Sequence, residues 1–324
     1  MTRQLGRSGI EVSDIGIGTW AIGGAFQTGD QPHGWGAVDD EQSVLAIRRA
    51  LELGVTLIDT SNAYGAGHAE EVIGRAVAGR RDAVVIATKW GYTFAPGTRE
   101  MTGEDSSVPH ARISLENSLR RLGTDYVDVF QLHLGGIEAD LASDLFAACE
   151  GFIDEGLIRT YGWSTDDPQR AELLAKSGRG AVVQHTLNVL GDAPEMLAVC
   201  ERHDLASLNR SPLAMGLLTA KVTGATTYGE DDVRGREPEW LRWFAGGRPA
   251  PEFLARRDAI RDILTSDGRT LSQGALAWNL ARSPRCVPIP GCRNAEQAEQ
   301  NAGVLTATPM RQEQLDEIAA LLAR

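Results

Sequence analysis

Five short apolar runs in this sequence each end in a polar residue that can take part in chemistry. Asp59, Lys89, His133, Ser164 and Gln184 stand at the carboxyl ends of these runs. Taken singly, each has a structural interpretation, such as a helix cap, a surface ion pair or a hydrogen bond that fixes a loop. Taken together they indicate a site, because the carboxyl ends of parallel strands in a closed barrel share one face, where active sites form.

Tyr64 adds a proton donor to this set. It follows Asp59 within the segment 60–65, so we expect it to fold over the same rim. A free tyrosine has a pKa near ~10, which a nearby ammonium lowers toward the range of general acids. Lys89 is the candidate ammonium, Asp59 its counter-ion, and His133 a hydrogen-bonding group that orients a carbonyl oxygen. This chemistry suits carbonyl reduction; the structural alternative for Tyr64 is a loop tyrosine bonded to backbone.

A different chemistry remains open for Lys89. A lysine at the end of a barrel strand can form a Schiff base with a carbonyl substrate, as in barrel lyases. The neighbouring Asp59 and Tyr64 favour the reductase over this alternative.

The elements that must position these residues alternate regularly along the chain. Buried parallel strands are predicted at 15–18, 56–59, 84–88, 127–132, 158–163, 182–184, 205–208 and 286–289. Amphipathic helices are predicted at 41–53, 68–77, 110–122, 141–155, 168–176, 194–203, 271–281 and 294–302.

This alternation predicts an α/β fold, a closed (β/α)8 TIM barrel in one domain spanning residues 1–324. An open doubly wound sheet is the alternative, although it usually has fewer strands. A short N-terminal β-hairpin is predicted from arms at 4–5 and 10–12, and an extra C-terminal helix at 312–322.

Three connections, at about 24–39, 91–107 and 219–252, are too long to serve only as connectors. The last carries Trp240, Trp243 and Phe244. Either these aromatic residues pack the loop onto the barrel rim, or the loop forms a lid or substrate wall. Both interpretations remain open.

One glycine motif is similar to a dinucleotide fingerprint but lacks its context. The segment 15–21 matches G-x-G-x-x-A, in which a helix should open at the second glycine. Gly23 and Gly24 follow instead, and Asp39 and Asp40 begin a helix rather than end a second strand. We therefore expect any dinucleotide to bind by another route.

Composition excludes several other classes of protein. The formal net charge is −12 with a pI of about 5.0, and no basic run is present, which argues against a nucleic-acid partner. The four cysteines form no CxxC pair or zinc spacing, so we expect reduced thiols and no metal. No apolar stretch approaches the ~18 residues of a membrane span. These features predict a cytoplasmic protein without a membrane partner, and no heptad or symmetric patch indicates an oligomeric state.

Several strings, in order along the chain, resemble the aldo-keto reductase family. They are Leu5-Gly6-Arg7-Ser8-Gly9, Gly18-Thr19-Trp20, Leu57-Ile58-Asp59-Thr60-Ser61, Tyr64-Gly65, Ala87-Thr88-Lys89, Leu122-Gly123-Thr124-Asp125-Tyr126-Val127-Asp128, Gln131-Leu132-His133, Ile289-Pro290-Gly291 and Asn301. The resemblance covers nearly the whole chain. It implies a (β/α)8 barrel that reduces the carbonyl of a small aldehyde or ketone to an alcohol, with Asp59, Tyr64, Lys89 and His133 as the catalytic residues. The substrate pocket that it implies is formed by Trp20, Tyr64, Trp90 and His133.

The same resemblance implies an extended NAD(P)(H) cofactor bound without a Rossmann fold. Residues matching the family's cofactor site are Gly18, Thr19, Trp20, Asp59, Ser164, Thr165, Gln184, Asn209, Arg210, Ser211, Pro212, Leu213, Gly216, Leu218, Gly291, Arg293, Gln297 and Asn301. Ser164 and Gln184 would hold the nicotinamide carboxamide, the segment 211–218 the pyrophosphate, and the segment 291–301 the adenosine half.

The chain departs from the family pattern at a few of these positions. Thr165 stands where many members have asparagine, and Asn209 or Arg210 near the place of an aromatic residue that often stacks on the nicotinamide. At Gln297 some members carry a basic residue that meets a 2′-phosphate, a role that Arg293 can take. NADP(H) is therefore preferred and NAD(H) remains possible. A second role within the resemblance is a non-catalytic nicotinamide-binding subunit, similar to barrel subunits of potassium channels.

Overall fold

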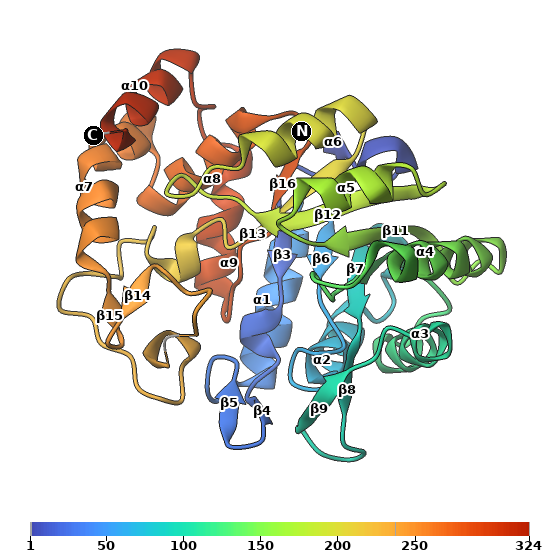
Figure 1. Cartoon of the computed structure of the whole chain (residues 1–324). Helices are drawn as coiled ribbons and strands as arrows, with labels where there is room; N and C mark the ends of the chain where they lie inside the picture. Colours follow the sequence, from blue (N-terminus) through green and yellow to red (C-terminus); the bar gives the residue numbers. More distant parts are fainter. Residues whose placement is uncertain (1, 237, 324) are drawn as a thin grey trace.

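The computed structural model describes residues 2–236 and 238–323. At its centre is one eight-stranded parallel sheet (Figure 1). In spatial order its strands are β3 (Gly16–Gly18), β6 (Leu57–Asp59), β7 (Val85–Trp90), β10 (Val127–Leu132), β11 (Ile158–Ser164), β12 (Gly180–Thr186), β13 (Ala206–Arg210) and β16 (Cys286–Pro288). The order along the chain equals the order in space, as expected when each strand returns through an outer helix. The predicted strand positions are confirmed, with ends shifted by at most two residues.

The sheet closes between its first and last strands. The Gly18 amide donates to the Pro290 carbonyl at 3.0 Å, and Gly18 and Gly291 form a parallel bridge. A Cβ atom at Gly18 would lie 2.8 Å from the Ile289 carbonyl oxygen, so the strands can approach closely there because residue 18 is glycine. The predicted (β/α)8 barrel is confirmed, and the fingerprint-like glycines belong to a barrel strand rather than to a phosphate loop.

Helices cover the outside of the barrel. They are α1 (Asp40–Glu52), α2 (His68–Val77), α3 (Val108–Leu122), α4 (Ala139–Asp154), α5 (Pro168–Ala175), α6 (Pro194–His203), α8 (Leu271–Arg282) and α9 (Ala295–Ala302). Side-chain caps begin several of them: Ser107 accepts from the His110 amide at 3.2 Å and Asp167 from the Gln169 amide at 2.8 Å. Because each helix packs one apolar face on the sheet, the strands are buried on both sides.

A short hairpin covers the amino-terminal end of the barrel. Its strands are β1 (Thr2–Gln4) and β2 (Glu11–Ser13), joined through a 3-10 turn at Gly6–Ser8. The predicted hairpin is confirmed, but its strands lie farther from the turn than the predicted arms at 4–5 and 10–12, because the Leu5 amide donates to the Ile10 carbonyl within the turn. Leu5, Ile10 and Val12 join one buried cluster with strand residues from the barrel interior. Because this hairpin covers the amino-terminal end, the carboxyl end of the barrel is the face available for a site.

The long connections contain structure that the sequence did not indicate. They carry three small hairpins, β4 (Phe26–Thr28) with β5 (Gln31–His33), β8 (Tyr92–Phe94) with β9 (Met101–Glu104), and β14 (Phe244–Ala245) with β15 (Arg248–Pro249). Figure 1 shows all three at the same end of the barrel, away from the N-terminus. Bridges between Gln27 and Glu100 and between Trp35 and Asp232 link them. The loops therefore build a wall around the carboxyl end of the barrel.

One helix, α7 (Pro251–Thr265), was missed, and the third long connection ends where it begins. The buried side of α7 carries Arg257, which is 2% exposed and donates to the Leu217 and Val222 carbonyls. A buried arginine interrupts the apolar periodicity on which the prediction relied. The predicted C-terminal helix is confirmed as α10 (Gln312–Leu322), and it packs beside α7 (Figure 1).

Candidate active site

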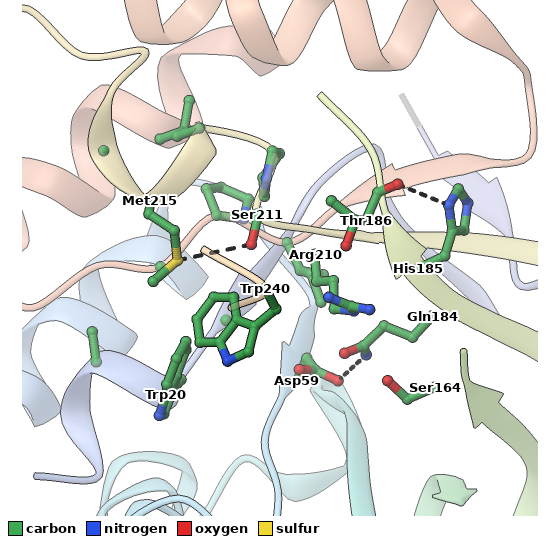
Figure 2. Close-up of a pocket in the computed structure, with 18 of the residues that line it drawn as sticks. Trp20, Asp59, Ser164, Gln184, His185, Thr186, Arg210, Ser211, Met215 and Trp240 are labelled. Carbon is green, nitrogen blue, oxygen red and sulfur yellow. Dashed lines mark hydrogen bonds between the residues drawn. The ribbon is translucent and has the colours of Figure 1, made fainter. Parts of the chain in front are cut away.

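The polar residues that end the strands meet at one cavity of about 1600 Å³ at the carboxyl end of the barrel. Figure 2 shows Asp59, Ser164 and Gln184 close together in it, with Arg210 beside Gln184 and with the Trp20 and Trp240 rings next to each other. Pockets for small ligands usually enclose about 300–1,000 Å³, so this cavity has room for a ligand as long as a dinucleotide.

Asp59 and Lys89 form a buried ion pair at the base of the cavity. The Lys89 Nζ atom lies 2.7 Å from Asp59 Oδ2 and also donates to the Thr60 carbonyl at 2.8 Å. The Lys89 side chain is 0% exposed and the Asp59 side chain is 2% exposed. The second carboxylate oxygen accepts from Gln184 Nε2 at 2.7 Å (Figure 2). It also accepts from Gln131 Nε2 at 3.2 Å. A full set of partners is what a buried carboxylate requires.

Tyr64 completes a chain of three groups. Its hydroxyl lies 3.1 Å from Lys89 Nζ, and its ring stacks on Trp20 with centroids 6.3 Å apart. Burial raises the pKa of Tyr64 and the Lys89 ammonium lowers it, while the Asp59 carboxylate raises it, so the pKa stands above its ordinary value. The predicted net lowering is therefore wrong for the free protein, because burial outweighs the ammonium. Tyr64 keeps its proton at neutral pH.

Lys89 remains an ammonium in this setting. Although burial disfavours its charge, Asp59 and Tyr64 raise the pKa of Lys89 above its ordinary value. Its side chain is 0% exposed and does not line the cavity. These observations argue against the Schiff-base alternative, which needs an accessible neutral amine.

The loop that carries Tyr64 is held by contact between two glycines. Gly65 has a φ of 64°, and a Cβ atom there would overlap the Gly23 carbonyl oxygen. We expect Gly65→Ala to lower the free energy of unfolding beyond the ~1–2 kcal/mol of a left-handed alanine and to displace Tyr64, with a roughly 10²-fold loss of turnover. Thermal unfolding and steady-state kinetics measure the two effects.

Gly123 offers a matched control, since its φ is 65° and nothing lies within 4 Å of a Cβ there. Gly123→Ala should show the backbone strain alone and keep full turnover. Equal losses in the two variants would contradict the packing argument.

His133 follows β10 and faces the same cavity. Burial lowers the pKa of His133 well below its ordinary value, and the Lys89 and Arg210 charges lower it further. The imidazole is therefore neutral at neutral pH. Its Nδ1 atom lies 3.1 Å from Ser61 Oγ, and its ring meets the Tyr64 and Tyr92 rings edge-on at 6.2 and 5.1 Å. A neutral imidazole beside a tyrosine hydroxyl can orient a carbonyl oxygen.

Most of the residues predicted for a cofactor line this cavity. They are Gly18, Thr19, Trp20, Asp59, Ser164, Thr165, Gln184, Arg210, Ser211, Pro212, Leu213, Gly216, Gly291, Arg293, Gln297 and Asn301. Tyr64 and His133, predicted for the substrate pocket, line it as well. The set extends from the ends of β11 and β12, around the segment after β13, to the start of α9.

Three predicted residues lie elsewhere. Asn209 and Leu218 are fully buried and do not line the cavity; the Asn209 amide donates to Ser207 Oγ at 2.8 Å. Trp90 is 1% exposed and stacks on Phe130 with ring centroids 5.7 Å apart, outside the cavity. The structure therefore gives no support to ligand contacts by these three side chains, which stay a prediction. Arg210, rather than Asn209, is the residue of β13 that faces the cavity.

Two residues of the site were not singled out from the sequence. Gln131 donates to Asp59, and Ser61 contacts His133. A signal for Gln131 was present, because it lies two positions after the inward-facing Val129 on the same strand. No comparable signal marks Ser61, which lies in an irregular segment.

The loop 219–252 combines both interpretations left open above. Trp243 and Phe244 are each 3% exposed and pack the loop onto the barrel, whereas Trp240 is 52% exposed and lies 5.9 Å from the Trp20 ring. The loop also contacts the loop 24–39: Arg234 lies 4.7 Å from the Trp35 ring. Trp240 thus forms part of the cavity wall.

The residues around the cavity suit an extended anionic dinucleotide. Lys221 and Arg293 line the part between β13 and α9, and the Arg293 guanidinium donates to the Trp35 and Ala37 carbonyls. Ser211 and Met215 hold positive φ angles of 52° and 55°, so backbone strain is concentrated in the segment predicted for pyrophosphate.

Neither a metal-binding cluster nor a membrane-spanning helix is present among the described residues. In residues 2–236 and 238–323, no group of three or more His, Cys, Asp or Glu is placed to hold a metal ion. Across the same ranges, no helix has both the length and the apolar character needed to cross a membrane.

A family model and a curated relative indicate the same family. The model of the Aldo/keto reductase family matches residues 14–323. The chain is 31% identical over 327 residues to aldo-keto reductase YhdN of Bacillus subtilis, covering 97% of this chain and 91% of that protein.

Solved structures agree with this match. The glycerol dehydrogenase AKR11B4 from Gluconobacter oxydans superposes with a TM-score of 0.84 at 28% identity, covering 100% of this chain and 95% of that one. An aldo-keto reductase from Klebsiella pneumoniae in complex with NADPH gives a TM-score of 0.74 at 28% identity, covering 99% and 94% of the two chains.

Proposed function

Because this chain belongs to the aldo/keto reductase family, a family of oxidoreductases, we propose that it reduces an aldehyde or ketone to an alcohol with NADPH as the hydride donor. The observation that supports this most is the Asp59–Lys89–Tyr64 chain, with contacts of 2.7 and 3.1 Å, in which the buried Lys89 joins two residues that line the cavity together with His133. The NADPH complex of a 28% identical relative supports the choice of cofactor.

The chain's own residues supply the proton and orient the substrate carbonyl. When bound, NADPH supplies the hydride that reduces the carbonyl carbon. Tyr64 donates its proton to the carbonyl oxygen, which completes the alcohol. The phenolate that remains lies 3.1 Å from the Lys89 ammonium, whose charge and position Asp59 holds. This contact stabilises charge where it develops, and His133 holds the oxygen toward Tyr64.

The binding residues divide along the cavity. We propose that Ser164, Thr165 and Gln184 bind the carboxamide end, with Arg210 at the position where other members carry an aromatic residue. Asp166 forms an ion pair with Arg210 and also accepts from the Thr186 amide at 2.7 Å, so the guanidinium is held in place. The segment 211–216 would bind pyrophosphate, and Arg293, Gln297 and Asn301 the adenosine half.

The preference for NADPH over NADH depends on Arg293 in this proposal. Arg293→Ala should raise the Kd for NADPH about tenfold to a hundredfold, since a charge-assisted hydrogen bond contributes roughly 1.5–3 kcal/mol. Quenching of tryptophan fluorescence measures both dissociation constants.

Titration of the same variant with NADH is the internal control, because Arg293 also holds the loop 24–39 through two carbonyls. Loosening of that loop weakens both cofactors equally. An equal loss for NADH and NADPH would therefore rule out a phosphate contact.

A panel of aldehydes and ketones, followed by loss of NADPH absorbance, tests the proposed function. Turnover on at least one class of carbonyl supports it. Tight cofactor binding without turnover on any of them would contradict it and favour the non-catalytic nicotinamide-binding role.

A further inference from the structure

Ser61 contacts His133 but does not itself line the cavity. Its side chain is 0% exposed, and its Oγ atom lies 3.1 Å from His133 Nδ1. It stands two residues after Asp59 in the loop that also carries Tyr64. His133 lines the cavity whereas Ser61 does not, so a ligand can meet the imidazole but not the serine.

The hydrogen-bond partners of Ser61 decide which way this contact runs. The Ala63 amide donates to Ser61 Oγ at 3.1 Å, which occupies one lone pair of the hydroxyl oxygen. The hydroxyl has one hydrogen, and its two available acceptors are His133 Nδ1 at 3.1 Å and Asn62 Oδ1 at 3.5 Å. The shorter contact favours donation to the imidazole, because 3.5 Å is long for an O–H donor.

A neutral imidazole carries one ring hydrogen, on either Nδ1 or Nε2. The buried position of His133 and the Lys89 and Arg210 charges hold its pKa well below the ordinary value, so the neutral ring is the relevant form. When Nδ1 accepts from Ser61, the ring hydrogen lies on Nε2. In the described part of the chain, no group forms a hydrogen bond with Nε2, which leaves it available to a ligand.

We propose that Ser61 is a positioning residue that fixes the Nε2–H tautomer of His133, so that this ring donates a hydrogen bond to the substrate carbonyl oxygen. The inference rests on the proposed reductase function. The opposite tautomer would present a nitrogen lone pair to the carbonyl oxygen, and two acceptors repel each other. Ser61 therefore acts through His133 and does not itself touch the substrate.

Nitrogen NMR of the free protein, labelled with 15N-histidine, reads the tautomer directly. The chain has six histidines, and a His133→Gln variant identifies the signals of His133. In the wild type we expect one protonated Nε2 and one unprotonated Nδ1. In Ser61→Ala the two shifts should move toward each other as the tautomers mix, with kcat falling about threefold to tenfold, the effect of one neutral hydrogen bond.

Ser114 provides a matched control. Its hydroxyl also lies 3.1 Å from a histidine, His110 Nε2, but on α3 and away from the cavity. Ser114→Ala should leave both the His133 signals and kcat unchanged. Ser61→Thr, which keeps the hydroxyl, should return the shifts and most of kcat toward the wild type, and this separates loss of the hydrogen bond from loss of the fold.

Two results would overturn the inference. One is a wild-type His133 with its hydrogen on Nδ1, and the other is a Ser61→Ala spectrum and kcat equal to those of the wild type. Because the tautomer is read without substrate or cofactor, this outcome is independent of the carbonyl assay. Failure to reduce any carbonyl would contradict the proposed function instead, and the tautomer would still decide what Ser61 does to His133.

Discussion

Tyr64→Phe is expected to lower kcat for carbonyl reduction by roughly 10²–10⁴-fold, the contribution of a well-placed general acid. The change removes one hydroxyl and keeps the ring that stacks on Trp20 at 6.3 Å. Lys89 loses the Tyr64 hydroxyl as a partner but retains Asp59 and the Thr60 carbonyl, so the buried ion pair stays in place. Steady-state assays with the best carbonyl substrate measure the loss.

Cofactor affinity separates a lost proton donor from a damaged site. The Kd of NADPH for Tyr64→Phe should stay within about twofold of the wild type, because no hydrogen bond to the cofactor is expected from this hydroxyl. Tyr161→Phe is a matched control: it also removes a buried tyrosine hydroxyl, one that donates to Glu150 at 2.7 Å and lies outside the cavity. Full turnover by Tyr64→Phe would show that another group supplies the proton.

The barrel and its rim were predictable because both depend on patterns within single segments. Strands buried on both faces form continuous apolar runs, and the end of each run is visible where Asp59 or His133 interrupts it. The signals for helix starts also lie within a few residues, as where the capping Asp167 precedes Pro168. Such features need no knowledge of what lies on the neighbouring strand.

Trp90 and Asn209 lie outside the cavity, although each was assigned to one site together with the consecutive residue of the same strand. Side chains alternate along a strand, so Lys89 faces the interior of the barrel and Trp90 faces the helices. The same alternation separates Arg210, which lines the cavity, from the buried Asn209. Once it is known which residues of a strand point into the barrel, this alternation is sufficient to tell Lys89 from Trp90 and Arg210 from Asn209.

Contacts between distant loops were beyond prediction from one sequence. Ser61 meets His133 across 72 positions, and Arg293 reaches the Trp35 carbonyl across 258. The prediction that the pKa of Tyr64 is lowered was wrong for a related reason. The direction of the pKa shift depends on the balance between burial and nearby charges, and burial, which the sequence does not give, is the largest cause and raises the pKa.

Breaking the Asp59–Lys89 pair is expected to affect both stability and catalysis. Lys89→Met leaves a buried carboxylate with two amide donors, and Asp59→Asn leaves a buried ammonium. Each change should lower the free energy of unfolding by about 3–5 kcal/mol, because one buried charge loses its partner. Each should also reduce kcat for carbonyl reduction, since Tyr64 loses the ammonium or the group that holds it. Urea unfolding and steady-state kinetics measure the two effects.

The single variants cannot separate a structural ion pair from a catalytic one, but the double variant can. In Asp59→Asn with Lys89→Met both charges are gone, so stability should return to within about 2 kcal/mol of the wild type. Turnover should stay low, because no ammonium then lies beside Tyr64 to stabilise its phenolate. As a control for ion pairs in general, Arg49→Ala breaks a pair with Glu299 whose side chains are 39% and 50% exposed, and it should change stability by less than about 1 kcal/mol. If the double variant regained turnover along with stability, the pair would serve only the fold, and the role given to Lys89 beside Tyr64 would have to be abandoned.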